Sequence, residues 1–238
     1  MGLSRKAMAI VPARGGSKRL PGKNLKMLNG KPLIGYTIEA ALRSGCFDKV
    51  LFSSDNEDLL EVASQFGAEC EMRPAYLAAD TSKVLELVNV LADREEFQRE
   101  FDVIALLLPT CPFRRPFDLK EGFRLLTEDV DSVVSVTDYD FPPQLGVKAN
   151  PESGLLEGLF HPSPLVTGDT RSQDQERILR PNGGFYMSWW GRFLENRNFF
   201  KGKVKPHVME REYSTDVDTI WDFEFAEFLL QNKKLILD

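Results

Sequence analysis

The stretch Ala7-Met-Ala-Ile-Val-Pro-Ala13, followed by Arg14-Gly-Gly-Ser-Lys-Arg-Leu-Pro-Gly-Lys-Asn24, decides the fold of this chain. The first segment is apolar throughout, as in a strand that is buried on both faces of a sheet. The second is rich in glycine and in basic residues. From Pro32, apolar residues recur with helical spacing as far as Gly45, a residue typical of helix ends. The opening therefore predicts a strand, a basic loop and a helix, in that order.

The same alternation continues along the chain. Further strands are predicted at Lys49–Ser53, 68–72, Val103–Leu108 and Ser132–Val136, with helical patterns between them. Strands that alternate with helices form a mostly parallel sheet with helices on both sides, so we expect a Rossmann-like α/β fold. In such sheets, ligands bind beyond the carboxyl ends of the strands. The basic loop follows directly after such an end.

Composition excludes several classes of protein. The chain has 238 residues and a formal net charge of −6, which argues against a surface that binds nucleic acid. Its three cysteines are far apart and form no CxxC motif, so neither a disulfide framework nor a zinc site is expected. No apolar run has the length of a signal peptide or the roughly 20 residues of a membrane span. We therefore expect a cytoplasmic protein with no membrane partner.

Residues from about 139 to 181 differ from the rest of the chain. They are rich in proline, glycine and polar residues and show little periodicity. A disordered insertion is one interpretation. The segment also carries several large apolar residues, and long structureless loops are uncommon inside compact domains, so an ordered arm is favoured. A final helix is predicted from Thr219 to about Asn232.

The basic loop, Arg14 to Asn24, is a candidate phosphate site. Glycine allows backbone N–H groups to approach phosphates, and arginine or lysine neutralises phosphate charge. The loop contains no GxGxxG motif, and Gly16 to Asn24 only approximates a P-loop. A flexible, solvated loop is the alternative. Its position after a buried strand favours phosphate binding.

Two further segments carry polar patterns. In Asp216-Val217-Asp218, the two carboxylates point to the same side of an extended backbone, and such oxygen ligands suit Mg²⁺. Alternatively, Asp218 caps the final helix; both roles can hold at once. In Arg180-Pro-Asn-Gly-Gly-Phe-Tyr186, the Asn-Gly pair favours a hairpin turn.

Taken together and in order, these segments resemble the N-acylneuraminate cytidylyltransferase family, the CMP-sialic acid synthetases. The resemblance covers nearly the whole chain and is much more specific in combination than in any part. The segments that carry it are Ile10-Val-Pro-Ala-Arg-Gly-Gly-Ser-Lys18 with Lys23-Asn24, Arg73-Pro-Ala-Tyr-Leu-Ala-Ala-Asp80, Leu108-Pro-Thr-Cys-Pro-Phe-Arg114, Thr170-Arg-Ser-Gln-Asp174, Asn182-Gly-Gly-Phe-Tyr186 and Ser214-Thr-Asp-Val-Asp-Thr219.

The resemblance implies one cytidylyltransferase domain over residues 1–238, of the nucleotide-diphospho-sugar transferase type. It also implies that residues of about 139–181 form a dimerisation arm, so that the protein is a homodimer. The implied substrates are CTP and an acidic nine-carbon sugar of the sialic-acid type, and the implied cofactor is Mg²⁺.

The resemblance further assigns roles to individual positions of this sequence. The nucleotide would be bound by Ala13, Arg14, Gly15, Gly16, Lys23, Asn24, Arg73 and Ser82. The sugar would be bound by Arg171, Gln173 and Asn182, and the metal by Asp216 and Asp218. Arg14, Lys23 and Asp218 would be catalytic.

The sequence departs from the family pattern mainly in one segment. The family has Gln, Ser and Leu where this chain has Leu108, Cys111 and Phe113, and that Gln contacts the sugar. We therefore expect a more apolar sugar pocket than in a plain sialic acid synthetase. A modified nonulosonic acid, such as a diacetamido-dideoxy sugar, becomes a plausible substrate.

The expected reaction is attack by the anomeric hydroxyl of the sugar on the α-phosphorus of CTP, with pyrophosphate as the leaving group. Such chemistry requires mainly positioning and charge neutralisation. Three alternatives stay open. They are a nucleotidyltransferase that uses another nucleoside triphosphate or acidic sugar, a nucleotide-sugar glycosyltransferase, and a non-catalytic nucleotide-binding protein of the same fold.

Overall fold

The computed structural model describes residues 5–79, 81–232, 235 and 237. They fall into two compact units. The main unit consists of the residues up to Val136 and those from Pro181 onward, and the inserted unit is Thr137–Arg180. The sequence placed the insertion at about 139–181, from its loss of periodicity alone.

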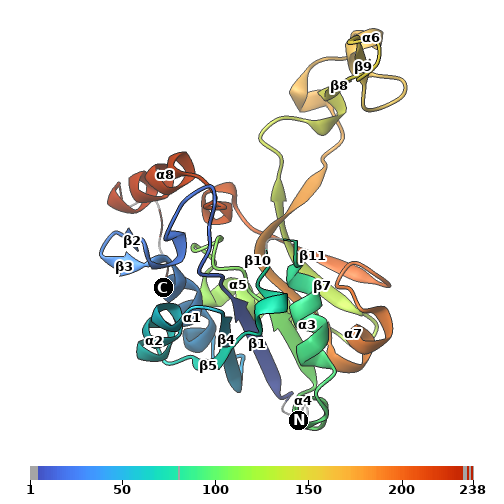
Figure 1. Cartoon of the computed structure of the whole chain (residues 1–238). Helices are drawn as coiled ribbons and strands as arrows, with labels where there is room; N and C mark the ends of the chain where they lie inside the picture. Colours follow the sequence, from blue (N-terminus) through green and yellow to red (C-terminus); the bar gives the residue numbers. More distant parts are fainter. Residues whose placement is uncertain (1–4, 80, 233–234, 236, 238) are drawn as a thin grey trace. The chain divides into compact units, whose positions relative to one another are not determined.

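A sheet forms the centre of the main unit (Figure 1). Within the described residues it has seven strands in the order β11-β7-β10-β6-β1-β4-β5. β1 pairs in parallel with β4 and β6, β4 with β5, and β7 with β11, whereas β10 is antiparallel to β6. The strands are β1 Ala7–Pro12, β4 Lys49–Ser54, β5 Glu69–Met72, β6 Val103–Leu106, β7 Ser132–Asp138, β10 Leu179–Trp189 and β11 Val204–Val208. The predicted mostly parallel α/β sheet is confirmed.

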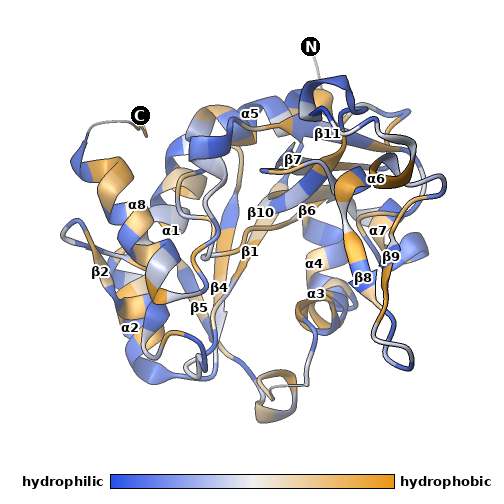
Figure 2. Cartoon of the chain, turned by 90° about the horizontal axis from the view of Figure 1, so that it is seen from above, coloured by the Kyte–Doolittle hydropathy of each residue, from blue (hydrophilic) through white to orange (hydrophobic). Residues whose placement is uncertain are grey.

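Helices cover both faces of this sheet (Figures 1 and 2). α1, α2 and α5 lie on one face, and α3, α4 and α7 lie on the other. α8 packs at one end of the unit against the small β2–β3 ribbon. The ranges are β2 Met27–Leu28, β3 Lys31–Pro32, α1 Leu33–Ser44, α2 Glu57–Gln65, α3 Val84–Ala92, α4 Glu95–Glu100, α5 Pro116–Leu125, α7 Trp190–Asn196 and α8 Ile220–Gln231.

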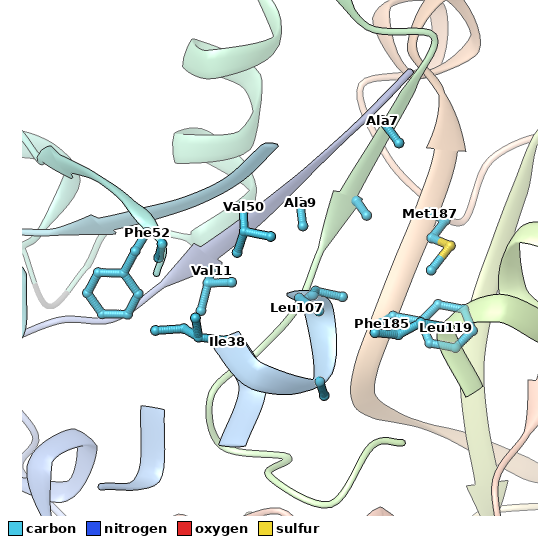
Figure 3. Packing of buried hydrophobic residues seen from close by; sticks show 14 of the residues in the cluster. Ala7, Ala9, Val11, Ile38, Val50, Phe52, Leu107, Leu119, Phe185 and Met187 are labelled. Carbon is cyan, nitrogen blue, oxygen red and sulfur yellow. The ribbon is translucent and has the colours of Figure 1, made fainter. Parts of the chain in front are cut away.

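The core explains why the opening segment is so apolar. Every residue of β1 is buried, because strands lie on both sides of it and helices cover both faces of the sheet. Figure 3 shows Ala9 and Val11 on the face that also receives Ile38 of α1 and Val50 of β4. Burial of such side chains contributes about 1.5–3 kcal/mol each for the larger ones. This core holds the ends of β1 and β6 in place, and the loops that follow them carry functional candidates.

Helix ends follow the sequence signals in most places. Gly45 ends α1 with φ 62°, and Asn56 caps α2 by accepting a hydrogen bond from the backbone N–H of Leu59 at 2.9 Å. Thr219, rather than Asp218, caps α8 through its side chain. The alternative role of Asp218 as a helix cap is therefore wrong, and its carboxylate has other partners.

Two expectations need correction. Asn182 and Gly183 form no hairpin turn; both lie inside the continuous strand β10, where Gly183 has φ 76°. The strand expected to reach Leu108 ends at Leu106. The sequence also failed to predict α4, α7 and β11, which are short elements stabilised by packing rather than by a long periodic pattern.

The inserted unit is ordered and contains short elements only. Its antiparallel ribbon joins β8 Val147–Ala149 to β9 Leu156–Gly158, and α6 spans Pro164–Thr167. 3₁₀ turns cover Pro143–Leu145 and Ser172–Asp174. The ordered arm, rather than disorder, is the correct interpretation of this segment. Among all described residues, no helix is long and apolar enough to cross a membrane.

Candidate active site

A cavity of about 720 Å³ lies in the main unit, beyond the carboxyl ends of its parallel strands. Its walls come from the loop after β1, the residues after β5, the start of α3 and the loop after β6. Loops that follow different strands of the sheet therefore meet at this edge. The lining residues are Pro12, Ala13, Arg14, Gly16, Ser17, Lys18, Arg19, Lys23, Asn24, Arg73, Leu77, Ser82, Val84, Leu108, Pro109, Thr110 and Asp218.

The basic loop and the acidic segment meet at this cavity. Lys23 Nζ donates to Asp218 Oδ1 at 2.8 Å, although 195 positions separate the two residues in sequence. Lys23 begins the 3₁₀ turn Lys23–Leu25, and Gly22 before it has φ 67°, a conformation that favours glycine. This turn buries the lysine stem and brings its ammonium group to the carboxylate. Opposite charges from the two ends of the chain thus share one wall.

Hydrogen bonds fix the loop between β1 and Lys23. Asn24 Nδ2 donates to the carbonyl oxygen of Arg14 at 3.0 Å, and Arg14 Nη1 donates to the carbonyl oxygen of Ala79 at 3.0 Å. The backbone N–H of Gly15 donates to Asp55 Oδ1 at 2.9 Å. The alternative of a flexible, solvated loop does not describe this arrangement.

The two adjacent glycines of the loop differ in what surrounds them. A Cβ at Gly15 would lie 2.9 Å from Asn56 Cβ, whereas a Cβ at Gly16 would meet no protein atom within 4 Å. Packing within the protein therefore requires a glycine at position 15 but not at position 16. Gly16 lines the cavity and Gly15 does not, so the glycine at 16 leaves space on the ligand side.

Arg73 and Ser82 form another part of the wall. Arg73 is buried, and its Nη2 donates to the carbonyl oxygen of Ser53 at 2.5 Å. Burial lowers the pKa of Arg73 to about 10, which the nearby Asp55 partly opposes. Ser82 donates its hydroxyl to the carbonyl oxygen of Tyr76 at 2.7 Å. Both side chains are thus held by backbone carbonyls at the cavity edge.

Asp216 and Asp218 lie close enough to influence each other. Partial burial raises the pKa of Asp216, a hydrogen bond from the Thr110 side chain lowers it, and the charge of Asp218 raises it again. Asp216 as a whole is exposed, although the adjoining protein desolvates its carboxyl group. A nearby cation would relieve both unfavourable effects, so the pair suits a divalent metal ion.

The same pair is too small to enclose a metal ion. Among the described residues, no group of three or more His, Cys, Asp or Glu side chains could hold one. Mg²⁺ commonly takes one or two carboxylates and completes its shell with water and substrate phosphates. Asp216 and Asp218 beside a cationic cavity match that donor set, whereas a metal ion caged by protein ligands alone does not.

Asn182 lies outside the cavity lining, unlike most of the predicted nucleotide-binding residues. It is buried, and its Nδ2 donates to Ser214 Oγ at 2.8 Å. Its Oδ1 accepts hydrogen bonds from Ser135 Oγ at 2.6 Å and from the backbone N–H of Gly184 at 3.0 Å. The amide therefore connects β7 and β10 to the segment that leads to Asp216.

The three departures from the family pattern occupy different environments. Leu108 lines the cavity, as expected for a residue of an apolar pocket. Cys111 and Phe113 are fully buried, and Phe113 packs edge-on against Tyr36 in the cluster beneath α8. The expectation that all three make the sugar pocket more apolar is therefore corrected. Only Leu108 contributes to the cavity wall.

The remaining predicted sugar ligands, Arg171 and Gln173, belong to the inserted unit. Both are exposed, at and beside the 3₁₀ turn Ser172–Asp174. The backbone around them is held locally, because Gln175 Nε2 donates to the carbonyl oxygen of Asp169 at 2.7 Å. Within this unit, both side chains are available to a ligand.

Sequence reasoning assigned no role to several lining residues, and two of them, Arg19 and Thr110, contact the acidic segment. Arg19 Nη2 donates to Asp218 Oδ2 at 2.6 Å. The carbonyl oxygen of Thr110 accepts a hydrogen bond from the backbone N–H of Val217 at 2.7 Å. The side chain of Thr110 forms a hydrogen bond with Asp216. Both residues lie inside segments that had been singled out. The sequence contains no signal that tells which basic residue of the loop faces the carboxylates.

The sequence of the chain is similar to those of known proteins. The family model "Cytidylyltransferase" matches residues 8–129. A CMP-N,N'-diacetyllegionaminic acid synthase from Legionella pneumophila is 34% identical over 228 residues, covering 94% of this chain and 96% of that protein. An N-acylneuraminate cytidylyltransferase from Streptococcus agalactiae is also 34% identical over 92% of this chain, which spans only 52% of that longer protein.

The fold is likewise shared with a solved structure. A CMP:2-keto-3-deoxy-manno-octonic acid synthetase complexed with CTP superimposes with a TM-score of 0.69 and 20% sequence identity. The match covers 96% of this chain and 99% of that one. At this identity, the likeness shows a common fold.

Proposed function

The chain belongs to the cytidylyltransferase family, and from this premise we propose that it transfers CMP from CTP to a nonulosonic acid and releases pyrophosphate. The observation that carries the proposal is the contact between Lys23 and Asp218 at the cavity wall. A triphosphate needs cations along its phosphates and carboxylates for its metal ion. This wall supplies both within one hydrogen-bond distance.

The nucleotide half of the cavity has a role for each polar residue. Arg14 and Lys23 neutralise the β- and γ-phosphates, and the open space at Gly16 lets the phosphates approach the backbone. Asn24 holds the loop through the Arg14 carbonyl while facing the cavity. Arg73 and Ser82 lie along the wall where the cytosine and ribose are expected.

The reaction forms one bond and breaks one bond at the α-phosphorus of CTP. The anomeric hydroxyl of the sugar attacks and loses its proton to water, while the bond to the β-phosphate oxygen breaks in line. Mg²⁺ held by Asp216 and Asp218 would supply positive charge to the α-phosphate and the leaving group. Arg14 and Lys23 stabilise the charge that grows on pyrophosphate, a contribution worth roughly 10²–10³ in rate for one well-placed donor.

The sugar is proposed to be a diacetamido-dideoxy nonulosonic acid. Leu108 presents an apolar side chain to the cavity, where a hydroxyl of the sugar would find no hydrogen-bond partner. A deoxy carbon or an acetamido methyl group suits such a wall better. The N,N'-diacetyllegionaminic acid named for the Legionella relative belongs to this chemical class.

The inserted unit is proposed to complete the protein as a homodimer. It exposes many large apolar side chains for its size, with Leu156 at 73% and Val166 at 85% of their full accessibility. A patch of this kind marks an interaction surface. A second copy of the chain would cover it, and Arg171 and Gln173 would then serve the carboxylate of the sugar. Replacing Leu156 and Val166 with serine should convert the dimer to a monomer in sedimentation experiments.

A cytoplasmic location is also proposed. Cys46, Cys70 and Cys111 form no disulfide with one another, and Cys111 is fully buried. A reducing compartment suits this state.

Pyrophosphate release tests the function directly. Each of the four nucleoside triphosphates is incubated with Mg²⁺ and a set of nonulosonic acids, and release is measured by a coupled assay. We expect turnover with CTP and with a diacetamido sugar. In Asp218→Asn we expect loss of turnover, while circular dichroism shows that the variant still folds. If the protein prefers another nucleoside triphosphate, it is a nucleotidyltransferase of different specificity. Near-wild-type turnover in Asp218→Asn would remove the metal assignment.

A further inference from the structure

Both carboxylate oxygens of Asp218 are already used within the protein. Oδ1 accepts from Lys23 Nζ at 2.8 Å and Oδ2 accepts from Arg19 Nη2 at 2.6 Å. Thr219 caps α8, so the helix does not need the Asp218 side chain. A metal ion that binds Asp218 must therefore compete with two cations for the same oxygens.

The two cations differ in how firmly the fold holds them. The Lys23 side chain is 10% exposed, whereas that of Arg19 is 67% exposed. Burial of the lysine stem leaves its ammonium group little freedom. The guanidinium of Arg19 lies in solvent at the cavity mouth, with Asp218 as the acceptor of its hydrogen bond. Exposed pairs of this kind exchange partners at little cost in free energy.

A bound triphosphate offers Arg19 a stronger partner. The guanidinium fork matches phosphate oxygens in a bidentate manner, and a triphosphate carries several negative charges against the single charge of Asp218. Arg19 lines the same cavity as Arg14 and Lys23, so it can reach phosphates there. Once it turns toward them, Oδ2 of Asp218 becomes available to the metal ion.

We propose that Arg19 is a functional residue of this site, which masks Asp218 before the nucleotide arrives and binds the triphosphate afterward. The consequence is positive coupling: nucleotide binding strengthens metal binding at Asp218, and the metal strengthens nucleotide binding by the same factor. The inference rests on the proposed function, which assigns Asp218 to the metal and the basic loop to the triphosphate.

The test compares metal binding in Arg19→Gln and in wild type without any nucleotide. Mn²⁺ is titrated and followed by electron paramagnetic resonance, with Asp218→Asn as the background. We expect Mn²⁺ to bind Arg19→Gln about two- to fivefold more tightly, the factor that one exposed ion pair represents. CTP should bind the variant more weakly, and the coupling between Mn²⁺ and CTP should fall by the same two- to fivefold. Melting temperatures should stay equal.

Lys18→Gln is the matched control, because it removes the same charge from the neighbouring position of the same cavity wall. Its gain in Mn²⁺ affinity without nucleotide should be clearly smaller than that of Arg19→Gln, because Arg19 Nη2 donates directly to Asp218 Oδ2. Equal or weaker Mn²⁺ binding in Arg19→Gln, or an equal gain in Lys18→Gln, would overturn the proposal. So would unchanged Mn²⁺ binding in Asp218→Asn. None of these titrations needs the sugar or turnover, so absence of pyrophosphate release would count against the proposed function alone.

Discussion

The wall of the cavity and the inserted unit differ in the kinds of side chain that they bury and expose. In the main unit, two charged residues of the cavity wall are buried and held: Lys23 keeps 8% of its accessibility and Arg73 keeps 5%. In the inserted unit, apolar residues are exposed, as Leu156 and Val166 illustrate, and so are the candidate sugar ligands. The first region is organised before any ligand arrives. The second exposes apolar side chains and candidate sugar ligands that a ligand or a second chain could cover.

This difference in exposure indicates which property of the protein depends on each region. A site that is already organised contributes charge stabilisation without reorganisation during the reaction. An exposed arginine or glutamine contributes mainly when a ligand or a second chain covers it. We therefore expect changes in the cavity wall to affect turnover, and changes in the inserted unit to affect sugar binding and association.

The largest effect is expected for Lys23→Gln. The variant keeps hydrogen-bonding capacity but loses the buried charge between Asp218 and the phosphates, so kcat/KM for CTP should fall about 10²–10³-fold. Steady-state pyrophosphate release measures it, with circular dichroism as the folding control. A loss smaller than fivefold would mean that the organised wall does not provide the charge stabilisation.

A smaller and more selective effect is expected for Arg171→Gln in the inserted unit. Loss of one charged hydrogen bond to the sugar carboxylate should raise KM for the sugar about 10- to 100-fold. KM for CTP should stay within twofold of wild type. Initial rates with each substrate varied in turn separate the two constants. A matching rise in KM for CTP would break the division between the two regions.

The adjacent glycines of the basic loop give a matched pair. Gly15→Ala places a Cβ 2.9 Å from Asn56 Cβ, so overpacking by about 1–3 kcal/mol should lower the melting temperature by roughly 2–10 °C. Gly16→Ala meets no protein atom and should melt like the wild type while raising KM for CTP. Thermal melts and CTP kinetics measure both. Equal melting temperatures in the two variants would contradict the difference in packing.

The smallest effect concerns the pH dependence of Asp216. Burial and the charge of Asp218 raise its pKa above the unfolded value, so the folded chain holds this proton more tightly. Ionised Asp216 therefore lowers stability above the folded pKa, and the penalty disappears as the pH falls through that pKa to the ordinary carboxyl value. Asp216→Asn should melt about 1–2 °C higher at pH 7, and less so at lower pH. If the difference in melting temperature between Asp216→Asn and wild type grows as the pH falls, the predicted direction of the effect is contradicted.

Prediction from sequence succeeded where local pattern and burial agree. The apolar opening, the basic loop and the helix that ends at Gly45 each carry a signal within a few residues, and all three are present. It failed for the Asn182-Gly183 pair, because its local turn preference yields to the pairing of β10 within the sheet. It also failed for α4, α7 and β11, whose stability comes from packing against distant segments.

Prediction of the site followed the same division. The residue types in the cavity wall could be chosen from the sequence, because phosphate chemistry demands cations, glycines and carboxylates. The sequence could not show which residue each of these side chains contacts. Asp218 was open to a role as helix cap until Thr219 was seen to cap α8, and Phe113 was assigned to the pocket although it packs in the core.

By itself, the sequence determined the α/β class, the location of the basic loop at a strand end and the boundaries of the insertion, because hydrophobic periodicity and composition are local properties. Only the tertiary structure decided that Arg19 and Lys23 both contact Asp218, that Leu108 alone of three altered residues lines the cavity, and that Asn182 donates to Ser214 in the interior. These are contacts between segments as much as 199 positions apart, and no local pattern encodes which distant atoms meet when the core closes.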